Sequence, residues 1–151
     1  MTGRTVDVPV AAIDTTVLYG AADASDARHD QALPILRGVD DGSLPEGVVV
    51  DYVLAETLNG VVRNISHESA VDYLRRIEGN DRFEVSRLTS EAFSTGKDVF
   101  QRHEQLSLVD GLIVGYLLDR GLEYLYSFDA GFDAAAGVTR LSTADDPYAP
   151  S

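Results

Sequence analysis

Short apolar runs alternate along this chain with longer segments whose apolar residues recur at helical spacing. The apolar runs are the expected strands, at residues 6–13, 47–50, 83–87, 122–127 and 138–141. The segments between them are the expected helices. Strands separated by helices need crossover connections, which favour a mostly parallel sheet with helices on both faces. We therefore expect a three-layer α/β/α fold with four to five strands.

The length of 151 residues is typical of one domain, and 44% hydrophobic residues suffice for a core. We expect a single domain over residues 1–151, with a core at about 8–141 and a loose acidic tail at 142–151. No apolar run approaches the ~18 to 20 residues that span a bilayer, and the N-terminus lacks the apolar core of a signal peptide. The chain has no cysteine, which excludes disulfides and thiolate metal sites. A cytoplasmic protein with no membrane partner is expected.

The formal net charge is -13, and of the 12 basic residues only Lys97 is a lysine. An acidic, lysine-poor surface suits molar salt, where repulsion between like charges is screened over ~3 Å. We therefore expect a halophilic, haloarchaeal source. The charge does not exclude nucleic acid as a partner, because binding at high salt relies on local contacts and metal ions.

Acidic residues stand at similar local positions after, or one helical turn from, the apolar runs: Asp14, Glu56, Asp110 and Asp129. If the runs form one parallel sheet, these acids can meet at its carboxyl edge. Oxygen ligands suit Mg²⁺ or Mn²⁺. Asp133 lies four residues after Asp129 and would share its face in a helical turn, which makes it a possible fifth ligand. The acids therefore predict a divalent-metal site.

Each acid also has a structural interpretation. Asp14 is a good N-cap for a following helix, and Glu56 favours the dipole of its helix. Because apolar residues flank Glu56 on both sides, we expect it to be partly buried. Ser107 and Asp110 match a capping box at the start of the helix over residues 107–120. Gly111 and Gly115 lie on one side of that helix, where close approach to the sheet would explain them.

Four short motifs occur in an order that resembles the signature of PIN-domain ribonucleases: D-T-T at 14–16, E at 56, S-x-x-D at 107–110 and S-F-D-x-x-F at 127–132. The resemblance covers roughly residues 8–141. A compact single-domain PIN protein is most similar to the VapC-type toxins of VapBC toxin–antitoxin modules. The resemblance implies a Mg²⁺- or Mn²⁺-dependent endoribonuclease, often a homodimer, that a cognate antitoxin holds inactive.

The resemblance also assigns roles to residues. Asp14, Glu56, Asp110 and Asp129 would form the acidic quartet that holds the metal, supported by Thr15 or Thr16, Ser107 and Ser127. Two positions depart from the family pattern, because Gly111 replaces a usual alanine and Ser127 a common threonine. Neither change removes a predicted ligand. Helical spacing adds Asn59 and Arg63, which share a face with Glu56 and could contact RNA phosphate.

Other functions remain open at this point. The chain could be a non-catalytic PIN-fold module that binds proteins, or a housekeeping PIN nuclease of RNA processing. A phospho-acceptor signalling domain is disfavoured because it needs a lysine after a late strand, whereas Lys97 lies inside a predicted helix. A phosphatase of the haloacid dehalogenase type would need an aspartate where Thr16 stands.

Overall fold

A computed structural model describes residues 8–150. The two residues that begin the first predicted strand, 6 and 7, lie outside the described range, as do the rest of the N-terminus and residue 151. The described residues form one five-stranded sheet, and all its neighbouring strands are parallel. The strands are β1 (Val10–Ile13), β2 (Glu46–Val50), β3 (Phe83–Ser86), β4 (Tyr124–Tyr126) and β5 (Thr139–Leu141). Their order is β3-β2-β1-β4-β5.

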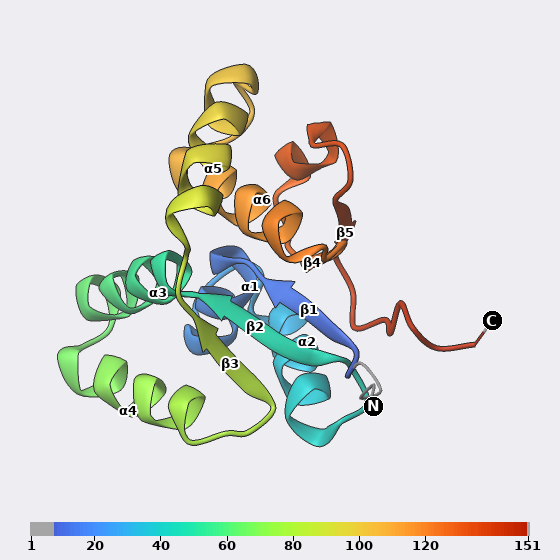
Figure 1. Cartoon of the computed structure of the whole chain (residues 1–151). Helices are drawn as coiled ribbons and strands as arrows, with labels where there is room; N and C mark the ends of the chain where they lie inside the picture. The colour runs from blue at the N-terminus through green and yellow to red at the C-terminus, as the bar shows by residue number, and fades with distance from the viewer. Residues whose placement is uncertain (1–7, 151) are drawn as a thin grey trace.

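Six α-helices connect the strands in the described part of the chain (Figure 1). They are α1 (Thr15–Ala22), α2 (His29–Asp41), α3 (Asp51–Asn64), α4 (His67–Glu78), α5 (Ser90–Arg102) and α6 (Leu108–Arg120), and a short 3₁₀ helix, η1 (Ala130–Ala134), follows β4. The prediction of an α/β fold with a mostly parallel sheet is confirmed, with five strands.

Helices cover both faces of the sheet. A Cβ atom added at Gly47 of β2 would meet Val39 of α2, so α2 packs on the face to which Gly47 points. Ser86 is in register with Val50, three residues after Gly47, so its side chain points to the opposite face. There it accepts a hydrogen bond from Tyr116 of α6 at 2.9 Å. The sheet therefore lies between two helical layers, as predicted.

Gly111 and Gly115 approach a helix and not the sheet, so the predicted reason for them was wrong. A Cβ atom at Gly111 would lie 2.7 Å from the carbonyl oxygen of Gly96 in α5. One at Gly115 would lie equally close to the Gly96 nitrogen. The glycines thus let α5 and α6 pack backbone to backbone, and this pair of helices rises above the sheet in Figure 1.

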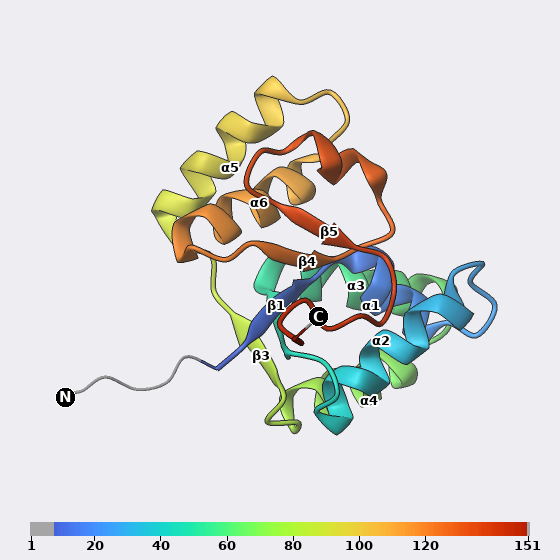
Figure 2. The ribbon, with the colours of Figure 1, turned by 90° about the vertical axis from the view of Figure 1, so that its right-hand side faces the viewer.

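Two residues of the tail that was predicted to be loose, Asp145 and Tyr148, form hydrogen bonds with the sheet. The Tyr126 hydroxyl donates to the Asp145 carbonyl oxygen at 2.6 Å. The Tyr148 hydroxyl donates to the Val10 carbonyl oxygen at 2.9 Å, and its ring packs edge-on against Tyr124. In Figure 2 the tail passes in front of β1, and Asp145 and Tyr148 tie it to residues of β1 and β4. Tyrosines supply both apolar contact and a hydroxyl, which explains why a polar tail can be held.

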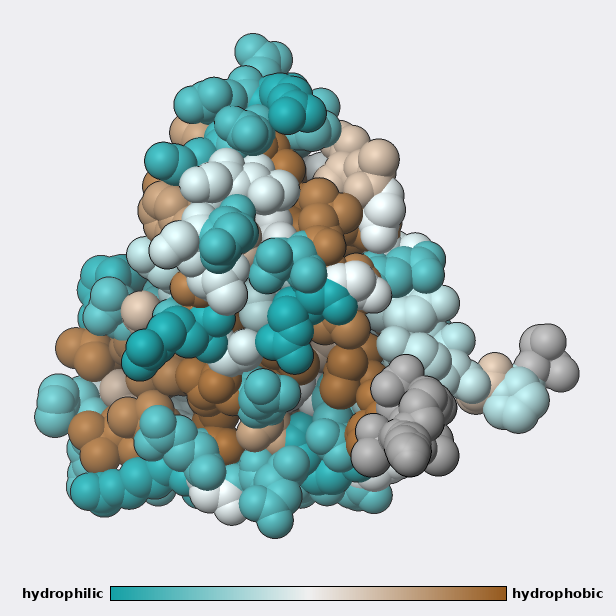
Figure 3. All heavy atoms as spheres, viewed as in Figure 1, coloured by the Kyte–Doolittle hydropathy of each residue, from teal (hydrophilic) through white to brown (hydrophobic). Residues whose placement is uncertain are grey.

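The surface is mixed in character. Hydrophilic side chains cover the upper part of the molecule over α5, and apolar side chains gather lower down around α3, α4 and β3 (Figure 3). Within residues 8–150, none of the helices has the length and apolar character needed to cross a bilayer.

Candidate active site

The strand order places the carboxyl ends of β1 and β4 next to each other. β1 pairs with β2 on one side and with β4 on the other, so the chain changes direction across the sheet between β1 and β4. Open parallel sheets bind ligands at such a switch point, beyond the carboxyl ends of the strands. Asp14 follows β1, and Ser127 and Asp129 follow β4. The fold therefore brings residues from the two ends of the chain to one edge.

Asp14 is the most constrained acid of the site, with 2% of its surface exposed. Its Oδ2 atom accepts hydrogen bonds from the hydroxyls of Thr16 and Ser127, each at 2.8 Å. Burial raises the pKa of Asp14 and these hydroxyls oppose the rise. Asp14 also occupies the N-cap position of α1, yet its side chain makes no capping hydrogen bond. The carboxylate is thus directed toward the site instead of its own helix.

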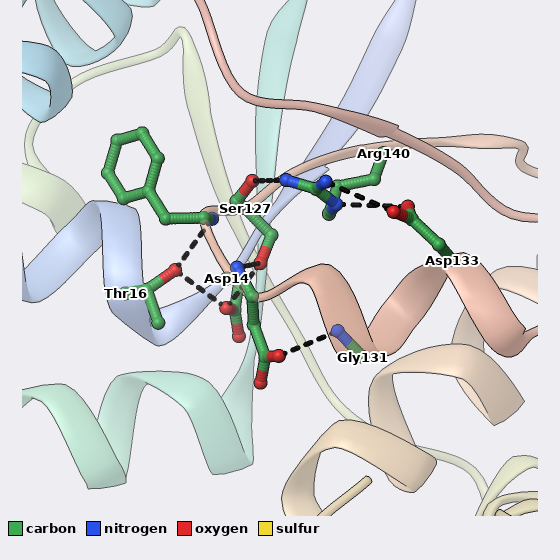
Figure 4. Close-up of polar contacts among 8 residues, drawn as sticks. Asp14, Thr16, Ser127, Gly131, Asp133 and Arg140 are labelled. Carbon is green, nitrogen blue, oxygen red and sulfur yellow. Dashed lines mark hydrogen bonds and ion pairs between the residues drawn. The ribbon is translucent and has the colours of Figure 1, made fainter. Parts of the chain in front are cut away.

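A small hydrogen-bonded unit surrounds this carboxylate (Figure 4). The hydroxyl oxygen of Thr16 accepts from the Phe128 backbone N–H at 3.1 Å, and that of Ser127 accepts from the Asp129 N–H at 3.0 Å. Each hydroxyl therefore donates to Asp14 and accepts from the segment after β4. Asp129 in turn accepts from the Gly131 N–H at 2.8 Å, which fixes its side chain. The predicted supporting residues Thr16 and Ser127 join the two strands in one unit.

Asp110 enters the site from the first turn of α6. It forms both hydrogen bonds of a capping box with Ser107, so the predicted cap is present and Ser107 acts as its partner. The pKa of Asp110 is raised to about 6, chiefly by burial and to a smaller degree by the charges of Asp14 and Asp129, against the hydrogen bonds from Ser107. The charges of Asp14 and Asp129 therefore act on Asp110. Capping and a role in the site do not exclude each other here.

A pocket of about 300 Å³ opens at this edge. It is lined by Asp14, Thr15, Thr16, Tyr19, Asp26, Arg28, Glu56 and Asp110. Three members of the predicted quartet therefore line one pocket. Asp129 is linked to this pocket because its N–H donates to Ser127 and its charge raises the pKa of Asp110. Glu56 is exposed on α3, so the expectation of partial burial was wrong. The face that α3 turns inward carries Val53, Thr57, Gly60 and Val61, and Glu56 lies outside this face.

The pocket offers oxygen ligands suited to a hard cation. The Thr15 hydroxyl oxygen is buried at the pocket and has no hydrogen-bond partner among residues 8–150, and the crowded negative charge on Asp14 and Asp110 favours a cation. Nevertheless, among residues 8–150 no three acidic or histidine side chains lie close enough together to form a metal-binding cluster. Mg²⁺ keeps several water ligands and needs only one or two carboxylates. The donor set therefore fits such an ion without being a complete cage for it.

Other predicted site residues lie elsewhere. Asp133 is exposed and forms a two-pronged contact with Arg140, at 3.0 and 3.1 Å, so it faces away from Asp14 (Figure 4). The 3₁₀ geometry of η1 causes this, because it turns Asp133 away from the direction of Asp129. Asn59 and Arg63 are exposed on α3 and do not line the pocket.

Three residues that line the pocket were not predicted from the sequence: Tyr19, Asp26 and Arg28. The last two lie in the loop between α1 and α2. Loop residues have no periodicity that would indicate which way they point. Tyr19 could have been suspected, since it lies one helical turn after Thr15.

Comparisons with known proteins agree with this fold. A search of curated proteins finds no match. Among solved structures, VapC20 of Mycobacterium tuberculosis, described as a toxin that cleaves the sarcin–ricin loop, is 25% identical, with a TM-score of 0.72 over 85% of this chain and 96% of that one. VapBC2 of Rickettsia felis, bound to promoter DNA, is 15% identical, with a TM-score of 0.67 over 87% and 97% of the two chains.

DNA-bound VapBC of Salmonella typhimurium is 17% identical, with a TM-score of 0.60 over 89% and 98% of the two chains. At these lower identities the likeness shows the fold alone. The family model described as the PIN domain matches residues 11–138, which spans the sheet from β1 almost to β5 and includes the four predicted acids. This chain belongs to the PIN-domain family.

Proposed function

We propose that this protein is a metal-dependent endoribonuclease that acts as the toxin of a toxin–antitoxin pair. The observation that carries the proposal is the buried Asp14 carboxylate, held by Thr16 and Ser127 at the β1–β4 switch point beside Asp110. PIN nucleases generally use divalent metal ions. The neighbouring structures of VapC toxins support the choice of RNA as substrate and of an antitoxin as partner.

The proposed roles follow from the positions of the side chains. Asp14, Asp110 and Asp129 would hold Mg²⁺ or Mn²⁺ directly or through water, and Glu56 would approach from α3. When bound, such an ion would orient and acidify a water molecule and stabilise negative charge on the scissile phosphate. Thr16 and Ser127 keep the Asp14 carboxylate fixed, and Ser107 does the same for Asp110. Asn59 and Arg63 remain candidates for contact with RNA outside the pocket.

A direct test is RNA cleavage with Mg²⁺ or Mn²⁺, using total RNA and an RNA that contains the sarcin–ricin loop. We expect wild type to cleave and Asp14→Asn and Asp110→Asn to be inactive. Asp98→Asn is the matched control, because it removes an exposed carboxylate on α5. Cleavage by Asp14→Asn at the wild-type rate would exclude the proposed site.

One observation favours a second candidate, a non-catalytic protein-binding module. The acids of the described chain are not gathered into a ready metal cluster. Calorimetric titration with Mn²⁺ separates the two. Metal binding that Asp14→Asn abolishes supports the nuclease, whereas no binding by wild type supports the module.

The biological setting completes the proposal. We propose a homodimer in the cytoplasm that its cognate antitoxin holds inactive, in a halophilic, haloarchaeal cell. The net charge of -13 supports the last point, because high salt would screen repulsion among these charges. Thermal unfolding in increasing KCl should therefore show a rising midpoint. A short reading frame that overlaps this one upstream would favour a toxin over a housekeeping nuclease.

A further inference from the structure

One cation lines the otherwise acidic pocket. Arg28 belongs to its wall together with Asp14, Asp26, Glu56 and Asp110. Despite these neighbours, Arg28 takes no part in the ion pairs found among residues 8–150, which involve Arg76, Arg82 and Arg140. A guanidinium carries five N–H donors in a planar fork, suited to phosphate. Arg28 thus keeps its charge and donors available beside the candidate catalytic acids.

The backbone of Arg28 is fixed from both sides. Its N–H donates to the Asp26 carboxylate at 2.8 Å. Its carbonyl oxygen accepts from Ala32 at 2.8 Å and from Gln31 at 3.1 Å, in the first turn of α2. A Cβ atom added at Gly20 would lie 3.6 Å from the Arg28 Cβ, so the base of the side chain packs closely on α1. The residue is therefore anchored although it lies in a loop.

The head of the side chain rests on an aromatic ring. The Arg28 guanidinium carbon lies 5.1 Å from the centroid of Phe128, within the range of a cation–π contact. Phe128 itself is 8% exposed, and its N–H donates to Thr16, whose hydroxyl donates to Asp14. The ring below the guanidinium and the Asp14 carboxylate thus belong to one hydrogen-bonded unit. Phe128 can hold the cation at the rim without letting it collapse onto the acids.

We propose that Arg28 binds a backbone phosphate of the RNA substrate next to the scissile bond, and that Phe128 is the residue that positions it. This rests on the proposed function for the choice of RNA. A polyanion that enters a pocket with several carboxylates meets repulsion, which a fixed cation at the rim offsets. A phosphate contact is independent of base identity, so Arg28 contributes affinity for any single strand and no sequence preference.

The test measures binding of a short single-stranded RNA by fluorescence anisotropy in the presence of EDTA. EDTA chelates divalent metal ions and so prevents metal-dependent cleavage of the RNA. Arg28→Ala should weaken binding about tenfold, the loss of one charge-assisted contact. It should also reduce the slope of log affinity against log salt by about one. Arg28→Lys should recover part of the affinity. Phe128→Leu should fall between wild type and Arg28→Ala and leave the salt slope nearly unchanged, because the charge remains.

Arg75→Ala is the matched control, since it removes an exposed arginine from α4. Equal affinities and salt slopes for Arg28→Ala and Arg75→Ala would overturn the proposal, whatever the cleavage assay shows. Loss of RNA binding in Arg28→Ala, together with a wild type that does not cleave RNA with Mg²⁺ or Mn²⁺, would leave the phosphate site standing and remove the nuclease. Circular dichroism of each variant confirms that the fold is kept.

Discussion

The pocket has two unlike flanks. On the strand flank, Asp14 and Asp129 are held by Ser127, Thr16 and the backbone after β4. On the helix flank, Glu56 stands exposed on α3, and the ion pairs of the described residues involve other acids. Both flanks carry a carboxylate, but only one of them carries a carboxylate whose position the fold dictates.

This difference assigns distinct roles. A ligand fixed by buried hydrogen bonds loses little side-chain freedom when it binds an ion, whereas an exposed glutamate loses up to about 2 kcal/mol of rotamer entropy. In the proposed metal-bound state, the strand flank would define where the cation sits, and the helix flank would adapt to it. Asp110 is intermediate, half-buried at the start of α6 and fixed by its capping box.

The largest effect is expected at the centre of the strand flank. Asp14→Asn should lower RNA cleavage by more than about a hundredfold, since even partners of a metal ligand change activity 10–100-fold. Its thermal unfolding midpoint at pH 7 should be no lower than that of wild type, because burial raises the pKa of Asp14 and its ionised form is costly. A variant that loses both activity and stability would mean that Asp14 is mainly structural.

Loss of a supporting hydroxyl is expected to come next. Ser127→Ala removes one of the donors to Asp14, and we expect Mn²⁺ affinity to fall roughly tenfold or more by calorimetry. Ser127→Thr, which restores the hydroxyl, should recover most of that affinity. If Ser127→Ala binds Mn²⁺ as wild type does, the strand flank is not what fixes the metal.

Glu56→Gln tests the adaptable flank. Since the side chain is exposed, we expect a loss of Mn²⁺ affinity of no more than about tenfold, smaller than that of Ser127→Ala. Comparison of the two variants in one titration series ranks the flanks. A larger loss for Glu56→Gln would reverse the comparison.

Asp110 should make the site sensitive to pH. Its pKa is about 6 in the folded protein against 3.8 in the unfolded chain, chiefly because of burial. The folded state thus binds more protons between these values, so stability without metal should fall as pH rises from about 4 to about 6. Mn²⁺ affinity should change in the opposite direction and weaken below pH 6. Asp110→Asn should flatten the stability profile, and an unchanged profile would contradict the assignment.

The smallest effect is expected at the opposite end of β1. Tyr148→Phe removes the hydrogen bond to Val10 and should cost about 1 kcal/mol of unfolding free energy in a urea titration. RNA cleavage should not change, because this contact lies at the far end of the strand from Asp14. Reduced cleavage would show that the tail and the pocket are coupled.

Periodicity and cap residues predicted the sheet and the helices well, because residues within or next to each segment indicate whether it forms a strand or a helix. Ser107 and Gly121, for example, mark both ends of α6, and Gly121 adopts the left-handed conformation that suits glycine. The placement of Asp14 and Asp129 followed from the rule that parallel strands share a carboxyl edge. These predictions needed only local signals and topology.

The contacts that were not predicted depend on how elements pack against one another and on which way each side chain points. Arg28 and Asp26 reach the pocket through the course of a loop, which no periodicity encodes. Gly111 contacts α5 because two helices pack together there. A glycine in a helix indicates close packing, but the sequence does not show whether the neighbour is a helix or the sheet. The exposure of Glu56 depended on the rotation of α3 about its axis.

The hydrogen bond between Ser127 and Asp14 joins residues 113 positions apart. During synthesis, β1 emerges first, but the neighbour that completes the site, β4, emerges only after β2, β3 and the helices between them. A partly made chain can form helices and the β1–β2 pair, yet it holds Asp14 without its partner hydroxyl and without Asp129. The proposed ribonuclease would therefore stay inactive on the ribosome until β4 has been made, because its topology withholds the last parts of the site until then.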